Sequence, residues 1–154
     1  MTLQDLASLA VILGALLGVP TLIMGLLEFS RQGAQRRVSH YLELGNRLRT
    51  DTVLHQMMEL LESDSPRLRK YSTADRAHLL GVFEELALML NSRLVTKHVA
   101  HYMFGYPVLL CWQSKNFWHG LDRESPYWAL FRDFASQMKA VQDSFSFNRR
   151  DFRF

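Results

Sequence analysis

A run of 22 residues without a charged side chain, Leu6–Leu27, constrains this chain more than any other feature. The run lies between Asp5 and Glu28, and most of its side chains are aliphatic. A helix needs about 20 residues to cross a hydrocarbon core that is about 30 Å thick. The run therefore predicts an N-terminal transmembrane anchor over residues 1–30, with the span at about residues 6–27.

Two other interpretations of this run are less favourable. A secretory signal peptide carries basic residues before its apolar part and a small-residue cleavage motif after it. Here Met1–Asp5 contains no Lys or Arg, and no such motif follows Leu27. A buried helix of a soluble core seldom lacks polar residues over about six turns. The membrane anchor is the interpretation that the pattern favours.

The charges beside the run predict its orientation. Arg31, Arg36 and Arg37 follow it closely, whereas Asp5 is the only charge before it. Basic residues next to a span stay on the cytoplasmic side. We therefore expect the protein in the inner (cell) membrane, with the N-terminus outside and the residues from about 29 to 154 in the cytoplasm.

Small residues recur along the predicted span. Ala10, Gly14 and Gly18 are four residues apart and share one helix face, and Gly25 falls near the same stripe. This spacing lets two helices approach closely and predicts a homo-oligomer. Pro20 removes a backbone donor in mid-span and is expected to kink the helix. The alternative is that Gly and Pro are common in membrane helices in general.

The rest of the chain predicts one small all-α domain over residues 31–144 and a basic, aromatic tail over residues 145–154. This length supports a single hydrophobic core. No alternating strand pattern is found, so the domain should be entirely helical. The single cysteine, Cys111, excludes a disulfide within the chain and indicates a reduced, buried thiol.

Apolar side chains after the span recur at helical spacing and predict one continuous stripe. The stripe consists of Tyr41, Leu44, Leu48, His55, Met58 and Leu61. Ser65 followed by Pro66 then predicts a newly capped turn.

A capping box predicts the next helix, because Asp75 follows Ser72 at the spacing at which each side chain bonds the other's backbone. We expect this helix to end near Asn91. Its expected core face consists of Leu79, Leu80, Phe83, Leu86, Ala87 and Leu90.

Three further helices are expected. One runs from about Thr96 to a stop at Gly105, where a left-handed backbone costs least. The next runs from Pro107 to Gly120, and the last opens at Ser125. The expected core stripe of the last helix consists of Trp128, Phe131, Phe134 and Met138.

Several segments within residues 75–138 resemble, in order, the motifs of a known family. They are Leu79–Leu88, Arg93–Val95, Tyr102–Gly105, Trp112 and Tyr127–Phe134. Together they resemble a domain-of-unknown-function family of short bacterial proteins, many with one N-terminal membrane helix. Family members often show Phe-Glu in the final helix, where this chain has Phe131-Arg132-Asp133-Phe134. The resemblance implies this layout and a helical fold, but no reaction, since the family is itself uncharacterised.

No catalytic motif is found in the sequence. His98 and His101 could hold a metal with Glu84 or Glu85, but they lack the sharper signature of metal-binding helices. Cys111 lies among aliphatic residues rather than in the electropositive setting of a reactive thiol. No Gly-x-Ser-x-Gly elbow or glycine-rich phosphate loop is present. We therefore expect no enzymatic activity, no metal and no cofactor.

Basic side chains are the remaining candidates for ligand binding. The candidates are Lys97, His98, His101 and Lys115 in the domain and Arg149, Arg150 and Arg153 in the tail. The first four would form one patch if two short helices packed as a hairpin. Guanidinium groups pair with phosphates and aromatic rings stack on bases, so the expected ligand is a small nucleotide rather than a long nucleic acid. A tail that lies on the anionic inner leaflet, or that frays, is the alternative.

Two function classes fit these features. The first is a membrane effector whose helical domain oligomerises, binds a small anionic signal and moves the kinked span. Its layout resembles the small membrane-anchored effectors of bacterial antiviral defence, including those of type III CRISPR systems that answer cyclic oligoadenylates. The second is a non-enzymatic tether or interaction module that holds a protein partner at the inner membrane. The small-residue stripe and the mid-span proline favour the effector.

Overall fold

The structure is a computed structural model that describes Met24, Glu28, Gly33, residues 35–144, Ser146 and residues 148–151. The chain divides into two compact units, Met1–Val38 and Ser39–Phe154. The described residues form helices and turns and contain no strand, which confirms the all-α prediction for this part of the chain.

No helix among these residues is both long and apolar enough to cross a bilayer. The span predicted over residues 6–27 lies outside the described residues, apart from Met24. The packing residues predicted for it are likewise outside them. These are Ala10, Gly14, Gly18, Pro20 and Gly25. The anchor and its packing face therefore stay predictions.

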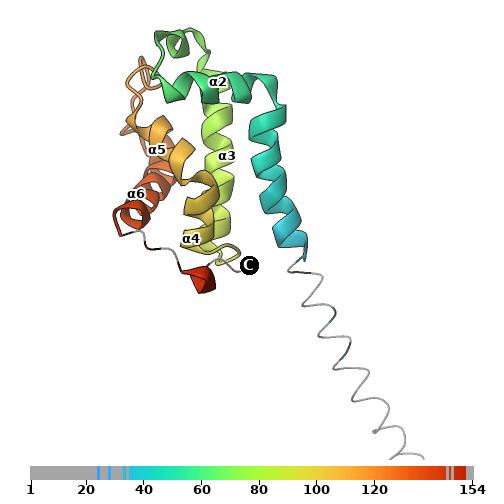
Figure 1. Cartoon of the computed structure of the whole chain (residues 1–154). Coiled ribbons are helices and arrows are strands. Elements are labelled where there is room, and N and C mark those ends of the chain that lie inside the picture. The colour runs from blue at the N-terminus through green and yellow to red at the C-terminus, as the bar shows by residue number, and fades with distance from the viewer. Residues whose placement is uncertain are drawn as a thin grey trace, which may run out of the picture. The chain divides into compact units, whose positions relative to one another are not determined.

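The helical unit begins with a helix over residues 39–50 and continues through short and long helices to residue 151. The elements are α2 (Thr52–Glu62), η1 (Pro66–Lys70), α3 (Thr73–Asn91), α4 (Lys97–Ala100), η2 (His101–Gly105), α5 (Tyr106–Gln113), η3 (Pro126–Trp128), α6 (Ala129–Asp143) and η4 (Arg149–Asp151). In Figure 1, α3 lies in the middle of this unit, with the helix over residues 39–50 on one side and α4, α5 and α6 on the other.

The predicted stripe from Tyr41 to Leu61 was wrong as a single helix, because the chain turns at Asp51. The Asp51 carboxylate accepts hydrogen bonds from the backbone N–H groups of Val53 and Leu54, at 2.9 and 3.1 Å, and so starts α2 afresh. The new helix buries Leu54, Met57 and Leu61. The expected members His55 and Met58 are exposed and half-buried, respectively.

The central helix α3 follows the sequence prediction closely. Ser72 and Asp75 form the capping box, and the helix ends at Asn91 with Ser92 as its cap. All six expected core residues are buried. The adjacent carboxylates of this helix point to different neighbours, as the helical period of about 100° per residue requires. Glu85 accepts a hydrogen bond from Arg47 at 3.0 Å, while Glu84 is half-buried and burial raises the pKa of its carboxyl.

A second correction concerns Gly105, which was expected to end a helix. Residues 97–113 are helical without a break, through α4, the π-helical turn η2 and α5. Gly105 has an ordinary helical φ of −58°. The wider π turn lies directly before Pro107, whose ring and missing N–H are poorly tolerated in a regular helix. A glycine avoids a clash there, since an added Cβ would lie 2.5 Å from Cδ2 of His101.

The core on the α6 side is aromatic. Phe131 is fully buried, and its ring lies 5.7 Å from that of Phe83, 6.2 Å from that of Trp112 and 6.1 Å from that of Trp118, between centroids. Of the predicted α6 stripe, Phe131, Phe134 and Met138 are buried, and Trp128 is half-buried against the core. This cluster joins α3, α5 and α6 into one packed body.

Candidate functional site

The structure does not bring the predicted domain patch together. Lys97 and His98 lie in α4 and His101 begins η2, whereas Lys115 follows the end of α5. The expected hairpin is not formed, because residues 97–113 are one helical stretch. A helix of this length separates its ends by about 25 Å at a rise of 1.5 Å per residue. Lys115 therefore lies far from the other three side chains.

His101 is better suited to packing than to binding a phosphate. The His101 ring lies against Gly105, and burial together with the nearby His98 lowers the pKa of His101 below its ordinary value. A lowered pKa keeps the imidazole neutral at physiological pH, so it offers no cation. Within the described part of the chain, no group of three or more His, Cys, Asp or Glu side chains is placed to hold a metal ion.

The tail arginines stay a prediction. Arg149 and Arg150 lie in η4 with exposed side chains, and the backbone N–H of Arg150 donates to the Asn148 side chain at 3.1 Å. Arg153 lies outside the described residues.

A cleft of about 520 Å³ opens between α2 and η1, and sequence reasoning missed it. Its lining residues are Gln56, Glu59, Leu60, Arg67, Lys70 and Tyr71. The volume lies in the range of small-molecule sites, about 300–1,000 Å³. This α2–η1 cleft is the candidate functional site.

The 3₁₀ geometry of η1 places two cations in this cleft. A 3₁₀ helix has three residues per turn, so side chains at i and i+3 stand above one another. Arg67 and Lys70 have this spacing and both line the cleft. Between them, Leu68 is fully buried and Arg69 donates from Nε to Oδ1 of Asn116 at 2.6 Å. The turn thus directs one side chain to the core, one to a neighbouring loop and two to the cleft.

Neither of the two cleft cations has an acidic partner among the residues that the structure describes. The ion pairs found there involve other side chains, and Glu59 pairs with Nε2 of His55 at 3.5 Å. The opposite wall is formed by Gln56, Glu59 and Leu60, which share one face of α2. Arg67 supplies a planar set of donors and Lys70 a compact charge, the two side chains that bind phosphates most often.

Asp64 fixes the position of η1. Its carboxylate accepts hydrogen bonds from the Ser114 hydroxyl at 2.6 Å and the backbone N–H of Asn116 at 3.1 Å, and its carbonyl accepts one from the Asn116 amide. Asp64 has a φ of 43°, in the left-handed region that Asp and Asn tolerate best. Burial opposes its ionisation, but the hydrogen bonds from Ser114, Asn116 and Lys115 outweigh burial and lower the pKa of Asp64.

Asp64→Asn should lower the free energy of unfolding by about 1 kcal/mol at neutral pH, because hydrogen bonds to a charged acceptor are stronger than those to a neutral one. Screening by solvent keeps this effect small. Asn keeps the shape and tolerates the backbone angle. The lowered pKa means that the contribution of Asp64 is complete above its ordinary pKa of about 3.9 and is lost as the pH falls through its folded value.

Urea unfolding at several pH values checks this. The gap between the parent and Asp64→Asn should close on acidification. Asp122→Asn is the control, because this exposed carboxylate accepts only a local hydrogen bond from the Glu124 N–H, at 3.0 Å. A gap of constant size down to pH 2 would contradict the assigned role of the charge.

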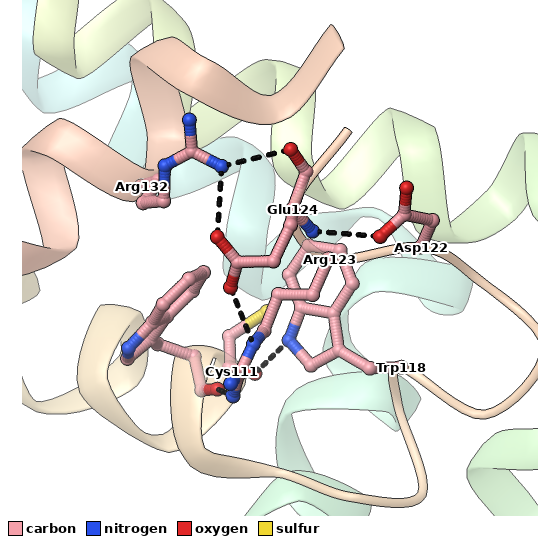
Figure 2. A network of polar contacts seen from close by, with 7 residues as sticks. Cys111, Trp118, Asp122, Arg123, Glu124 and Arg132 are labelled. Atoms are coloured by element: carbon pink, nitrogen blue, oxygen red, sulfur yellow. Dashed lines mark hydrogen bonds and ion pairs between the residues drawn. The ribbon is translucent and has the colours of Figure 1, made fainter. Parts of the chain in front are cut away.

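A second groove, of about 450 Å³, lies between α5 and α6 and includes Arg132 and Lys139. Its cations are paired within the protein. Lys139 contacts Asp143 at 2.5 Å, and Arg132 donates to the Glu124 carboxylate at 3.2 Å and to the Glu124 carbonyl at 3.0 Å. Figure 2 shows that Glu124 lies between Arg132 and Arg123. These contacts hold the loop before η3 against α5 and α6 rather than leaving cations for a ligand.

The contacts of Arg123 and Trp118 lie next to the single cysteine, Cys111. Arg123 lies over the Trp112 ring at 4.4 Å from its centroid, and Nε1 of Trp118 donates to the carbonyl of Cys111 at 3.0 Å (Figure 2). Cys111 is free and buried, and burial raises the pKa of its thiol well above the ordinary value. Since the thiolate is the reactive form, this cysteine is inert.

Comparison with known proteins adds no assignment. No protein-family model matches the chain, and no curated protein or solved structure shows significant similarity to it. The candidate site therefore rests on the contacts and charges of the cleft itself.

Proposed function

We propose that this chain is a single-pass membrane effector whose helical domain binds a small anionic signal in the α2–η1 cleft. The observation that carries the binding step is the pair Arg67 and Lys70, which line one cleft without an acidic partner among the described residues. The membrane step rests on the uncharged run Leu6–Leu27. The proposed site of action is the inner membrane, with the helical domain in the cytoplasm.

The signal in this proposal is a nucleotide second messenger, and a cyclic oligonucleotide is one form of it. A phosphate bound between Arg67 and Lys70 would neutralise two like charges on one 3₁₀ turn. That turn is joined to the loop after α5 through the bond from Arg69 to Asn116. A ligand shifts a conformational equilibrium only when it binds one state better than the other. In this proposal a bound phosphate removes the repulsion between Arg67 and Lys70, so it binds best to the state in which these two side chains lie close together.

The membrane response in this proposal is self-association of the span through Ala10, Gly14 and Gly18. The similarity in layout to small membrane-anchored effectors of antiviral defence supports a role of this kind. The resemblance to the bacterial family with one N-terminal membrane helix supports the layout alone. No reaction is proposed, and the effector needs no catalytic group.

The test is thermal unfolding of the full chain in detergent against nucleoside mono- and triphosphates, cyclic dinucleotides and cyclic oligoadenylates. A ligand at a hundredfold its Kd stabilises the folded state by about 2.7 kcal/mol. For a domain of this size the midpoint should rise by roughly ten degrees. The double variant Arg67→Ala/Lys70→Ala should lose this rise. The matched control Arg149→Ala/Arg150→Ala also removes two exposed cations and should keep it.

Vesicles that contain the full chain give the second readout. The nucleotide that raises the midpoint should cause leakage of a trapped dye, and Gly14→Leu/Gly18→Leu should abolish leakage without changing the thermal shift. A flat panel would overturn the binding step and favour the tether. A shift that is lost in the tail control but kept in the cleft variant would move the site to Arg149 and Arg150.

A further inference from the structure

The two walls of the α2–η1 cleft carry opposite charges. Arg67 and Lys70 stand on η1, and the Glu59 carboxylate stands on α2 beside the Gln56 amide. Gln56 and Glu59 are three residues apart, so they lie on the same helix face. The cleft is therefore bipolar, with two cations on one wall and a carboxylate on the other.

These opposite charges do not neutralise one another. No nitrogen of Arg67 or Lys70 lies within 4.0 Å of a described carboxylate oxygen, and the contact that Glu59 makes is with Nε2 of His55, at 3.5 Å. The Gln56 carbonyl oxygen already accepts a hydrogen bond from the Tyr71 hydroxyl at 3.3 Å. The side chain of Glu59 is 67% exposed, so its oxygens have room for a further donor.

A bipolar cleft discriminates between anions. A compact polyanion gains from Arg67 and Lys70 but is repelled by Glu59. A ligand that also carries a hydroxyl or ammonium group gains from both walls, because a charged carboxylate is a strong acceptor. Glu59 thus discriminates in two ways, because it repels a compact polyanion and attracts a hydroxyl or ammonium group.

We propose that the cleft takes a phosphate ester whose alcohol part carries a hydroxyl or ammonium group, with the phosphate on Arg67 and Lys70 and that donor on Glu59. This inference rests on the proposed anion binding in the same cleft. The shared chemistry has two sources, the ribose phosphate of a nucleotide and the phosphoethanolamine headgroup of a lipid. Inorganic phosphate and polyphosphate are excluded as preferred ligands.

The experiment is calorimetric titration of the full chain in detergent with two matched probes. O-phosphoethanolamine and ethyl phosphate carry the same phosphate, but only the first has an ammonium group. The parent should bind O-phosphoethanolamine about tenfold more tightly than ethyl phosphate. In Glu59→Gln the preference should fall to about twofold, while ethyl phosphate should bind a few-fold more tightly than to the parent. Glu59 is exposed, so this variant should fold normally.

The outcomes separate the inference from the function on which it rests. Equal binding of both probes to the parent, lost in Arg67→Ala/Lys70→Ala, would overturn the bipolar ligand but keep the anion site. If neither probe shows binding that is lost in Arg67→Ala/Lys70→Ala, the proposed anion site and the bipolar ligand are both overturned. Ribose 5-phosphate and dihexanoyl phosphatidylethanolamine then distinguish the soluble from the lipid source, and a preference for either over ethyl phosphate supports the proposal.

Discussion

Phe131→Ala should lower the free energy of unfolding by about 3–5 kcal/mol, the usual range for truncating a buried phenylalanine. The Phe131 ring is fully buried and lies between Phe83 of α3 and the rings of Trp112 and Trp118. Its removal takes apolar surface out of the core and leaves a cavity that these three large rings cannot close by small shifts. A small domain has a total stability of only about 5–15 kcal/mol, so the variant should be marginally folded at 37 °C.

Urea unfolding of the full chain in detergent, followed by tryptophan fluorescence, measures this effect. Two of the three tryptophans touch the Phe131 ring, so their emission reports directly on the cluster. The matched control is Tyr127→Ala, one helical turn earlier, because Tyr127 is 86% exposed and should change the stability by less than about 0.5 kcal/mol. A loss below 1 kcal/mol for Phe131→Ala would mean that this cluster is not the core.

Local signals in the sequence were enough to predict much of the fold. The capping box at Ser72 and Asp75 is determined by four consecutive residues, and both of its bonds are present. Ser65 and Pro66 cap η1 as expected. The core faces of α3 and α6 follow from the helical period, which depends only on neighbours along the chain.

Tertiary contacts decided what local signals could not predict. The end of α3 is a left-handed cap at Arg93, with φ 56°, where sequence rules expect glycine. Leu94 and Arg93 donate to the carbonyls of Met89 and Leu90, both at 2.9 Å, and this bond pattern ends the helix without a glycine. Arg76 is buried and donates to the carbonyls of Phe117 and His119, more than 40 residues away, which no local pattern indicates.

The same limit applies to the candidate site. Sequence reasoning grouped Lys97, His98 and His101 with Lys115 because it expected a hairpin, and a continuous helix separates them. An α-helical pattern does not group Arg67 with Lys70, because the three-residue period that aligns them belongs to a 3₁₀ turn. The opposite wall comes from α2, whose register was shifted by the break at Asp51. The signal for the pair in the sequence is a period of three within the turn that Ser65 caps.

Gly105→Ala should lower the free energy of unfolding by about 1–3 kcal/mol, the range for forcing an extra methyl group into a packed site. Its Cβ would lie 2.5 Å from Cδ2 and 3.0 Å from Cγ of His101, and the second atom cannot move far because it is next to the Cβ of that residue. Gly81→Ala is the matched control in α3. An added Cβ at Gly81 meets nothing within 4 Å, so this variant should gain about 0.5–1 kcal/mol from the better helix propensity of alanine.

A double variant identifies the cause of the loss. If the His101 ring is the obstacle, His101→Ala/Gly105→Ala should recover part of the stability lost in Gly105→Ala, and the two changes should be non-additive by at least about 0.5 kcal/mol. Additive losses would show instead that the π turn itself rejects alanine. The helix stop that the sequence predicts at Gly105 implies a different result. A left-handed backbone disfavours alanine whatever residue stands at position 101, so the cost of Gly105→Ala would not depend on His101. Measuring the four stabilities together decides between a glycine kept for its backbone angle and one kept for the space beside an imidazole ring.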